Sequence, residues 1–199
     1  MSPRGLSLRA LKLPRGSVRE LTCEFGPGVH VIVGPNGIGK TSLLECIAGV
    51  LPPAAGTVQF DGRDITSGSS RVVLAPNAPP PIPWIRAGLL LEFVVSLYPA
   101  TRRDTVYVRG VLERFGLTLV MDSRLGTLSA GTARKLLLAA ALIAAPPVML
   151  FDEPTNEIDA QSIGGFRDLV AESAAQRVVL ITTHHAGDLE SLRPSIFPV

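Results

Sequence analysis

The segment that most constrains this chain is the eight-residue run Gly34-Pro35-Asn36-Gly37-Ile38-Gly39-Lys40-Thr41. It satisfies the pattern G-x-x-x-x-G-K-[ST] at every fixed position. The apolar run Val29–Val33 before it favours a strand buried on both faces, and the stretch after Lys40 favours a helix. Glycines let such a loop turn its backbone N–H groups toward phosphate oxygens, and the helix dipole points its positive end at the same place. The sequence therefore predicts a phosphate-binding turn between a central strand and a helix.

The residues of this loop differ in the chemistry that we expect of them. Lys40, one of three lysines beside 16 arginines, can reach the terminal phosphates of a nucleotide as a point charge. The Thr41 hydroxyl can ligate Mg²⁺. The nucleotide contacts are expected from Gly34, Pro35, Asn36, Gly37, Ile38, Gly39, Lys40, Thr41 and Ser42.

A second element of the sequence, an acidic one, fits the same chemistry. The run Val148–Asp152 is an apolar strand that ends in an acid, and Asp152 is expected to hold the Mg²⁺ directly or through water. Glu153 follows at the strand tip, where a carboxylate can polarise an attacking water molecule. Taken alone, the Asp-Glu pair fits a solvated strand end before a turn at Pro154 equally well. Beside a complete phosphate-binding loop, the catalytic interpretation is favoured.

Apolar strand patterns alternate with helical stretches along most of the chain, which predicts an α/β fold with a parallel sheet covered on both faces. Residues 6–33 contain short strands joined by tight turns, and Asp61-Gly62 is expected to turn an edge hairpin. The region of about 78–127 has no convincing strand. It begins near five prolines between positions 76 and 83 and is expected to form a helical insertion.

Composition excludes several classes of protein. At 46% hydrophobic and 18% charged residues, the chain is too apolar for disorder, and its net charge of +2 gives no strong field for nucleic acid. The longest uncharged run, Leu136 to Phe151, is broken by Pro146-Pro147 and is shorter than the ~20 residues that a spanning helix needs. No secretory signal is expected. The two cysteines, at positions 23 and 46, fit small buried residues in a reducing compartment.

Three further motifs complete a resemblance to a known family. Leu128-Ser129-Ala130-Gly131-Thr132 is similar to the signature LSGGQ, the run Glu153–Asp159 is similar to the passage from Walker B to the D-loop, and Thr183-His184 matches the switch histidine. With these motifs the sequence resembles the ATP-binding subunits of ABC transporters over essentially its whole length. The resemblance implies a P-loop NTPase fold with a mainly parallel central sheet, an N-terminal antiparallel β subdomain and a helical insertion. It implies one domain over residues 1–199, with an ATP-binding core (1–77 and 128–199) and a helical subdomain (about 78–127).

The resemblance also implies roles for single residues. In this family two subunits pack head to tail, so the signature residues Ser129, Ala130, Gly131 and Thr132 would contact the ATP of the partner. His184 would contact the γ-phosphate and steady the water that Glu153 activates. Asp159 occupies the D-loop position. Asn77 stands where the family has the Q-loop glutamine, and would contribute to the Mg²⁺ site.

The chain departs from the family pattern at several positions. Asn77 is one methylene shorter than the expected glutamine, and Ala130 and Thr132 replace a glycine and a glutamine of the signature. Residues 1–20 contain no aromatic residue to stack on adenine, so Leu11 or Leu13 is expected to cover the base. These departures predict a working but slow ATPase.

The function implied is therefore an ATP-binding and ATP-hydrolysing subunit, using ATP and Mg²⁺, that powers an ABC transporter. Its partners would be a second ATPase subunit, identical or not, and separate polytopic membrane subunits, with no nucleic acid. Its location would be cytoplasmic, peripheral on the inner face of the membrane. The alternatives are a degenerate nucleotide-binding partner in a heterodimer, a soluble ABC ATPase of translation or DNA repair, and a small-molecule kinase. Trp84 is expected either as an anchor for the membrane subunits or in the core of the insertion, and His30 and His185 are expected to serve packing.

Overall fold

The computed structural model describes residues 5–18, 20–65, 67–98, 104–184 and 186–199, and in these ranges it contains two β-sheets and five α-helices. His185, which was expected to serve packing, lies outside the described residues. The strands are β1 Leu6–Lys12, β2 Leu21–Phe25, β3 Gly28–Val33, β4 Ala55–Phe60, β5 Arg63–Asp64, β6 Val72–Ala75, β7 Val148–Asp152, β8 Val178–Thr182 and β9 Ser195–Pro198. The helices are α1 Lys40–Ile47, α2 Ala87–Ser96, α3 Thr105–Arg114, α4 Ala130–Ala144 and α5 Ala160–Ala174, with 3₁₀ turns η1 Thr118–Val120, η2 Leu125–Thr127 and η3 Ala186–Leu192.

The two sheets have different strand directions. One is antiparallel with the order β2-β1-β4-β5, and the other is parallel with the order β6-β7-β8-β3-β9. In the parallel sheet the strands register closely, with Ala75 beside Phe151 and Phe151 beside Ile181. Because all five strands run the same way, their carboxyl ends meet at one edge of the sheet.

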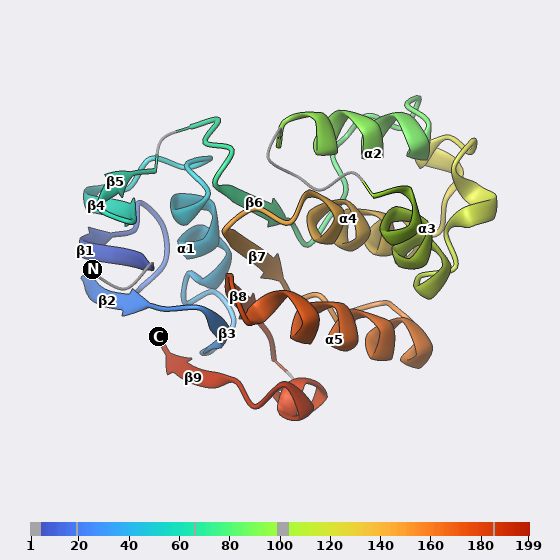
Figure 1. The fold of residues 1–199 in the computed structure, drawn as a ribbon. Coiled ribbons are helices and arrows are strands. Elements are labelled where there is room, and N and C mark those ends of the chain that lie inside the picture. The colour runs from blue at the N-terminus through green and yellow to red at the C-terminus, as the bar shows by residue number, and fades with distance from the viewer. Residues whose placement is uncertain (1–4, 19, 66, 99–103, 185) are drawn as a thin grey trace.

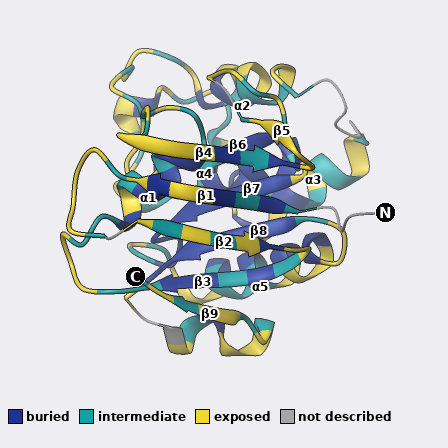
Figure 2. Ribbon diagram, turned by 90° about the vertical axis from the view of Figure 1, so that its left-hand side faces the viewer, coloured by how far each residue is buried: buried dark blue, intermediate teal, exposed yellow. Residues whose placement is uncertain are grey.

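The layers follow from the alternation of side chains along the strands. Along β7, Val148 and Leu150 pack with α1 and the antiparallel sheet, whereas Met149 and Phe151 pack with α4 and α5. Figure 1 shows α1 between the two sheets and α4 and α5 on the other face of the parallel sheet. All five residues of β7 and of β8 are buried, as expected for central strands covered on both sides. The outer face of the antiparallel sheet is exposed in places (Figure 2).

The region between β6 and α4 contains α2, α3, η1 and η2. Its described part has no strand, only an isolated bridge between Arg86 and Arg124. Helices α2 and α3 pack against α4, and α3 also packs against α5 (Figure 1). The expected helical insertion is therefore present.

Most of the predicted elements are confirmed, and one was missed. Asp61 and Gly62 turn the hairpin from β4 to β5 with φ values of 50° and 71°, as its sequence predicted. The edge strand β9 was not predicted, because its four residues carry no strand pattern of their own. It forms by pairing with β3, where His30 lies beside Ser195. In the described residues, no helix is both long and apolar enough to cross a membrane.

Candidate active site

Four strands of the parallel sheet deliver the predicted site residues to one edge. The glycine-rich loop follows β3, Asn77 follows β6, Asp152 and Glu153 lie at the end of β7, and His184 follows β8. These residues are up to 150 positions apart in sequence. The parallel topology brings them together, because the carboxyl ends of adjacent strands are neighbours.

The glycine-rich loop has the conformation that its glycines permit. Gly37 and Gly39 have φ values of 77° and 123°, and Gly39 immediately precedes α1. A Cβ on Gly34 would lie 2.9 Å from the Val199 carbonyl oxygen, so only glycine fits there without a shift. The Lys40 ammonium is buried against the loop and donates to the carbonyl oxygens of Gly34 (2.8 Å) and Pro35 (3.3 Å). The loop therefore holds a cation at its centre.

Asp152 is the centre of a short chain of hydroxyl contacts. Thr41 Oγ1 donates to Asp152 Oδ2 at 2.9 Å, and Thr182 Oγ1 donates to Asp152 Oδ1 at 2.6 Å. The carboxylate is buried, with 3% of the residue exposed. These bonds join the start of α1, the end of β7 and the end of β8. They fix the orientation of a carboxylate that the sequence predicted as a metal ligand.

A cavity of about 260 Å³ opens beside this carboxylate, and Thr41, Asn77 and Asp152 are among its lining residues. A hydroxyl, an amide and a carboxylate offer oxygen atoms, which are the ligands that Mg²⁺ prefers. The donor set therefore fits this ion.

Hydrogen bonds fix Glu153 at its backbone N–H and at its carboxylate. It has a φ of 50°, in the left-handed region that glycine favours. Its N–H donates to the carbonyl oxygen (3.1 Å) and to Oγ1 (3.0 Å) of Thr182. Its Oε2 accepts from the backbone N–H of His184 at 3.1 Å, and His184 Nε2 lies 2.8 Å from its Oε1, although not in the alignment of a hydrogen bond. The histidine side chain is 38% exposed and the glutamate side chain 8%. Glu153 thus lies at the inner end of the pair and His184 at its outer end.

The signature residues begin α4. Ser129 caps this helix, because its Oγ accepts from the Thr132 N–H at 3.2 Å and lies 2.8 Å from the Thr132 hydroxyl. A Cβ on Gly131 would overlap the carbonyl oxygen of Glu157, so the signature packs tightly against the loop that follows β7. Ser129 and Ala130 are exposed, and Gly131 and Thr132 are half-buried. The helix start is therefore accessible from outside.

Asp159 caps the next helix, α5. Its carboxylate accepts from the Ser162 N–H at 2.8 Å and pairs with Lys135 of α4 at 3.1 Å. The Ser162 N–H, followed by Lys135 and the Ser162 hydroxyl, lowers the pKa of Asp159 to about 2. The D-loop position is thereby tied to the signature helix.

Two residues of this site were not predicted from the sequence. Thr182 orients both Asp152 and Glu153. The feature of the sequence that pointed to it was a polar residue at the end of an apolar strand. Arg134 is buried in α4, with 2% of the residue exposed, and donates to the backbone carbonyl oxygens of Asn77 and Glu153 and of the residue before each. The feature of the sequence that pointed to Arg134 was a cationic residue at a core-facing position of an otherwise apolar helix.

Two expectations about other residues need correction. Leu11 is fully buried in the core between the sheets, so it cannot cover a base, whereas Leu13 is half-buried beside Gly39. Trp84 is 66% exposed, which rules out a place in the core of the insertion. His30 serves packing as expected, because its Nε2 lies 2.9 Å from the Gly26 carbonyl oxygen and its ring meets Phe25 edge to face.

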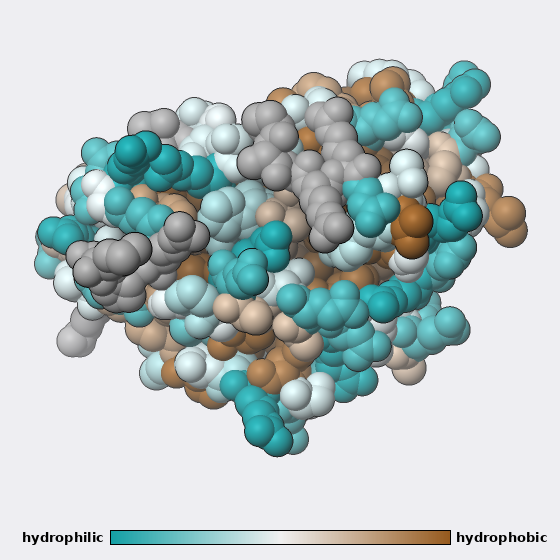
Figure 3. Space-filling model, in the orientation of Figure 1, coloured by the Kyte–Doolittle hydropathy of each residue, from teal (hydrophilic) through white to brown (hydrophobic). Residues whose placement is uncertain are grey.

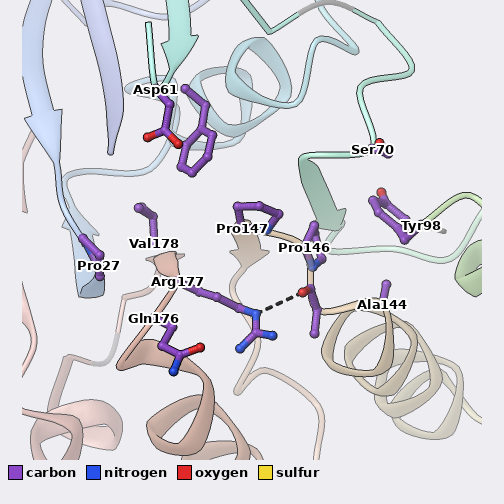
Figure 4. A pocket seen from close by; sticks show the side chains of 12 residues that line it. Pro27, Asp61, Ser70, Tyr98, Ala144, Pro146, Pro147, Gln176, Arg177 and Val178 are labelled. Atoms are coloured by element: carbon purple, nitrogen blue, oxygen red, sulfur yellow. Dashed lines mark hydrogen bonds between the residues drawn. The ribbon is translucent and has the colours of Figure 1, made fainter. Parts of the chain in front are cut away.

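Another cavity, of about 310 Å³, lies at the opposite end of the parallel strands (Figure 4). It is bordered by Pro147 and Val178, where β7 and β8 begin, and by Arg177, whose Nε donates to the Ala145 carbonyl oxygen at 3.0 Å. None of the predicted site residues lines it. In the described part of the chain, the predicted site residues therefore gather at the carboxyl edge and not at this cavity.

Comparisons with known proteins agree with this geometry. The family model described as ABC transporter matches residues 18–156. The chain is 31% identical to the ABC transporter ATP-binding protein NatA of Bacillus subtilis over 186 residues, which are 90% of this chain and 75% of that protein. It is 32% identical to the cytochrome c biogenesis ATP-binding export protein CcmA of Pseudomonas putida over 178 residues, covering 83% of this chain and 81% of that one.

The solved structures include an ABC transporter ATP-binding protein from Pyrococcus furiosus. It superposes with a TM-score of 0.75 at 27% identity and covers 90% of both chains. Another solved structure, an ATP-binding subunit of an ABC transporter, has a TM-score of 0.85 at 20% identity and therefore supports the fold alone. The family model, the two relatives and the site at the carboxyl edge lead to one conclusion: the chain belongs to the ABC transporter family, as an ATP-binding subunit.

Proposed function

We propose that this chain hydrolyses ATP to power a transporter whose substrate passes through separate membrane subunits. The observation that carries the proposal is the meeting of Thr41, Asp152, Glu153 and His184 at one sheet edge, beside the glycine-rich loop. A phosphate cradle, a buried carboxylate for a metal and a second carboxylate for a water molecule are the parts that phosphoryl transfer to water needs. The core would be residues 1–77 and 128–199, and the helical subdomain about 78–127.

In this proposal the glycine-rich loop binds the nucleotide. The backbone N–H groups from Gly34 to Thr41 face the phosphates, and Lys40 exchanges its carbonyl partners for phosphate oxygens. Thr41, Asp152 and Asn77 would hold Mg²⁺, which would neutralise charge on the phosphates. Ser42 lies in the first turn of α1 at the same site. Leu13, beside Gly39, is left to cover the base.

The hydrolytic step would use Glu153 and His184. A water oxygen attacks the γ-phosphorus while the bond from that phosphorus to the ADP oxygen breaks, and Glu153 accepts the proton that the water loses. His184 holds the carboxylate through its backbone N–H and brings an imidazole to the outer side of the same group. The pair can therefore orient a water molecule and receive its proton.

A second ATPase subunit, identical to this chain or not, would complete each site. The start of α4 would offer backbone N–H groups and a positive dipole end to a γ-phosphate of the partner. In the single chain, the Ser129 hydroxyl oxygen accepts a hydrogen bond from its own helix and so caps it. We infer that this hydroxyl turns toward the phosphate when the dimer forms.

The membrane subunits would dock on the helical region. Six of the eight large hydrophobic side chains that are exposed in the described residues lie between 78 and 127. Among them Leu89 and Phe93 of α2 and Leu97, its C-cap, recur every four residues, which places them on one face, and Trp84 precedes that helix. Figure 3 shows hydrophobic side chains over α2 and near η1. Docking there would place the chain on the cytoplasmic face of the membrane.

The test is Glu153→Gln, with Glu172→Gln on the surface of α5 as the matched control. We expect Glu153→Gln to lose ATPase activity by about 100-fold or more and to form a dimer only with ATP and Mg²⁺ by light scattering. The control should hydrolyse ATP at the wild-type rate. Unchanged hydrolysis in Glu153→Gln would remove the assigned role of Glu153.

The same measurement separates the alternative functions. The departures at Asn77, Ala130 and Thr132 favour a degenerate partner in a heterodimer as the second candidate. That candidate predicts a wild-type chain that binds ATP, remains monomeric and hydrolyses nothing on its own. A small-molecule kinase predicts no ATP-driven dimer and a large rise in ATP turnover with an acceptor.

A further inference from the structure

The arginine at position 134 occupies an unusual environment. It lies in α4 with 2% of its surface exposed, and no ion pair joins it to a described carboxylate. Its guanidinium instead donates to four backbone carbonyl oxygens. Nη1 donates to Pro76 (3.2 Å) and Asn77, and Nη2 donates to Asp152 and Glu153.

These four carbonyls belong to two neighbouring strand ends. Pro76 and Asn77 follow β6, and Asp152 and Glu153 end and follow β7, the strand that pairs with β6. Carbonyl groups just beyond a strand lose their partners in the sheet and need another donor when they are buried. The planar fork of a guanidinium presents two pairs of N–H groups at a fixed angle, so one arginine can hold both strand ends at a set distance.

The contact with Glu153 has a particular consequence. Its φ of 50° is disfavoured for a residue with a Cβ, so the surrounding contacts must maintain it. Thr182 holds the Glu153 N–H, and Arg134 holds its carbonyl oxygen. The direction of the Glu153 side chain depends on this backbone conformation, and the carboxylate must reach its water molecule with sub-ångström precision.

Burial of this cation is costly. Desolvation lowers the pKa of Arg134, while Asp152, Glu157 and Glu153 act in the opposite direction. Its Nε is buried without a hydrogen-bond partner in the described structure. The hydrogen bonds to the four carbonyl oxygens offset part of this cost, and an apolar side chain of similar volume would leave those carbonyl groups without this donor. The geometry of two strand ends therefore depends on one buried side chain.

We propose that Arg134 is a positioning residue for ATP hydrolysis, which fixes the backbone of Glu153 and Asn77 and joins both to the signature helix. This inference rests on the proposed function. Arg134 lies two residues beyond the signature residues Ser129–Thr132 in the helix that Ser129 caps, so it ties the face offered to the partner's ATP to the carboxylate of the chain's own site. It makes no described hydrogen bond to the glycine-rich loop, which would contact the phosphates, so ATP affinity should depend on it much less than kcat does.

The experiment compares Arg134→Lys and Arg134→Met with wild type, and uses Arg114→Met as the matched control. Arg114 is an arginine of α3 whose guanidinium pairs at the surface with Glu172 at 3.1 Å. Steady-state kcat and KM for ATP hydrolysis, equilibrium ATP binding and thermal unfolding are measured for each. We expect both Arg134 variants to lose about 10- to 100-fold in kcat with KM and ATP affinity within about threefold of wild type. Lysine should not rescue, because it carries the charge without the fork.

Several results would overturn the inference. One is a kcat within about twofold of wild type in both folded variants, and another is a parallel loss of kcat and ATP affinity. Failure of both variants to fold would make Arg134 a residue of stability alone. These outcomes are distinct from a failure of the proposed function, which would appear as a wild-type chain without ATPase activity.

Discussion

His184 contacts both carboxylate oxygens of Glu153: its backbone N–H donates to Oε2 at 3.1 Å, and its Nε2 lies 2.8 Å from Oε1. The two residues come from different strands, because Glu153 follows β7 and His184 follows β8. The backbone contact does not depend on the imidazole. The side chain of His184 can therefore be removed while the hydrogen bond from its backbone N–H to the carboxylate remains. This allows the role of the imidazole to be measured separately.

His184→Ala is expected to lower kcat for ATP hydrolysis by about 10- to 100-fold. The carboxylate keeps its backbone bond, so the loss reports the imidazole alone. KM should change little, because the glycine-rich loop is untouched. Steady-state kinetics measure both constants.

His30→Ala is the control for this variant. His30 lies on β3 and contacts the Gly26 carbonyl oxygen and the Phe25 ring, away from the carboxyl edge. Its kcat should match wild type. If both variants lost the same fraction of activity, the imidazole of His184 would have no specific role.

Thr182→Val is expected to reduce both stability and kcat. The hydroxyl is fully buried, donates to Asp152 and accepts from the Glu153 N–H, and valine has the same shape without it. Leaving these groups short of a partner should cost about 1–3 kcal/mol in the free energy of unfolding. Urea unfolding measures this cost. Thr182→Ser keeps the hydroxyl and should retain most of the activity, so equal losses in the two variants would contradict the assignment.

Gly131→Ala and Gly164→Ala should have opposite effects on stability. A Cβ on Gly131 overlaps the Glu157 carbonyl oxygen, whereas a Cβ on Gly164, inside α5, meets no atom within 4 Å. We expect Gly131→Ala to destabilise the fold by about 1–3 kcal/mol through overpacking. Gly164→Ala should stabilise it by up to about 1 kcal/mol through helix propensity. Thermal and urea unfolding compare the two, and a neutral Gly131→Ala would argue against close packing of the signature on its own D-loop.

Asp159 predicts a dependence of stability on acidity. Its pKa is lowered to about 2 in the folded chain, from an ordinary value of 3.8, so its charge stabilises the fold at pH values above about 4. That contribution is lost as pH falls from about 4 to about 2. Asp159→Asn should therefore be less stable than wild type at pH 7, and the difference should shrink across this range.

Lys135→Met provides the control for this pH dependence, because Lys135 pairs with Asp159 at 3.1 Å. In the Lys135→Met background, Asp159→Asn should lower the free energy of unfolding at pH 7 by less than it does in wild type, but the difference should not vanish. The Ser162 N–H, which contributes most to the lowered pKa of Asp159, is still present there. Urea unfolding from pH 7 to pH 3 measures each difference. A gap that stayed constant with pH would contradict the assignment of the charge.

The two thiols should react slowly in the folded chain. Burial raises the pKa of Cys23 and of Cys46 to about 11, with Glu45 adding to the effect at Cys46. Since only the thiolate reacts, exchange with a disulfide reagent at pH 8 should be at least about tenfold slower than in the urea-unfolded chain. Equal rates in the two states would show that neither thiol is protected.

Local sequence was sufficient for the elements whose signals are local. The glycine-rich loop, the buried strands β3, β7 and β8, and the Asp61-Gly62 turn each follow from the residues that compose them. The positions of Thr41, Asp152 and Glu153 could also be expected, because a parallel sheet brings the ends of its strands to one edge.

Contacts between distant segments could not be predicted in this way. β9 is a strand only because β3 offers it an edge, and Leu11 is buried because the antiparallel sheet closes over α1. The exposure of Trp84 also depends on tertiary packing, because the sequence before α2 fits both an exposed and a buried position.

The sequence by itself determined the chemistry of this protein, since a phosphate-binding loop, two acids and a histidine are recognisable from residue types and spacing. Tertiary structure alone decided how those groups are held. Thr182, at the end of the neighbouring strand β8, orients Asp152 and Glu153, and Arg134 reaches carbonyl groups 57 residues away on one side and 19 on the other. Burial and hydrogen-bond geometry arise only when these segments pack together, so no pattern along the chain records them.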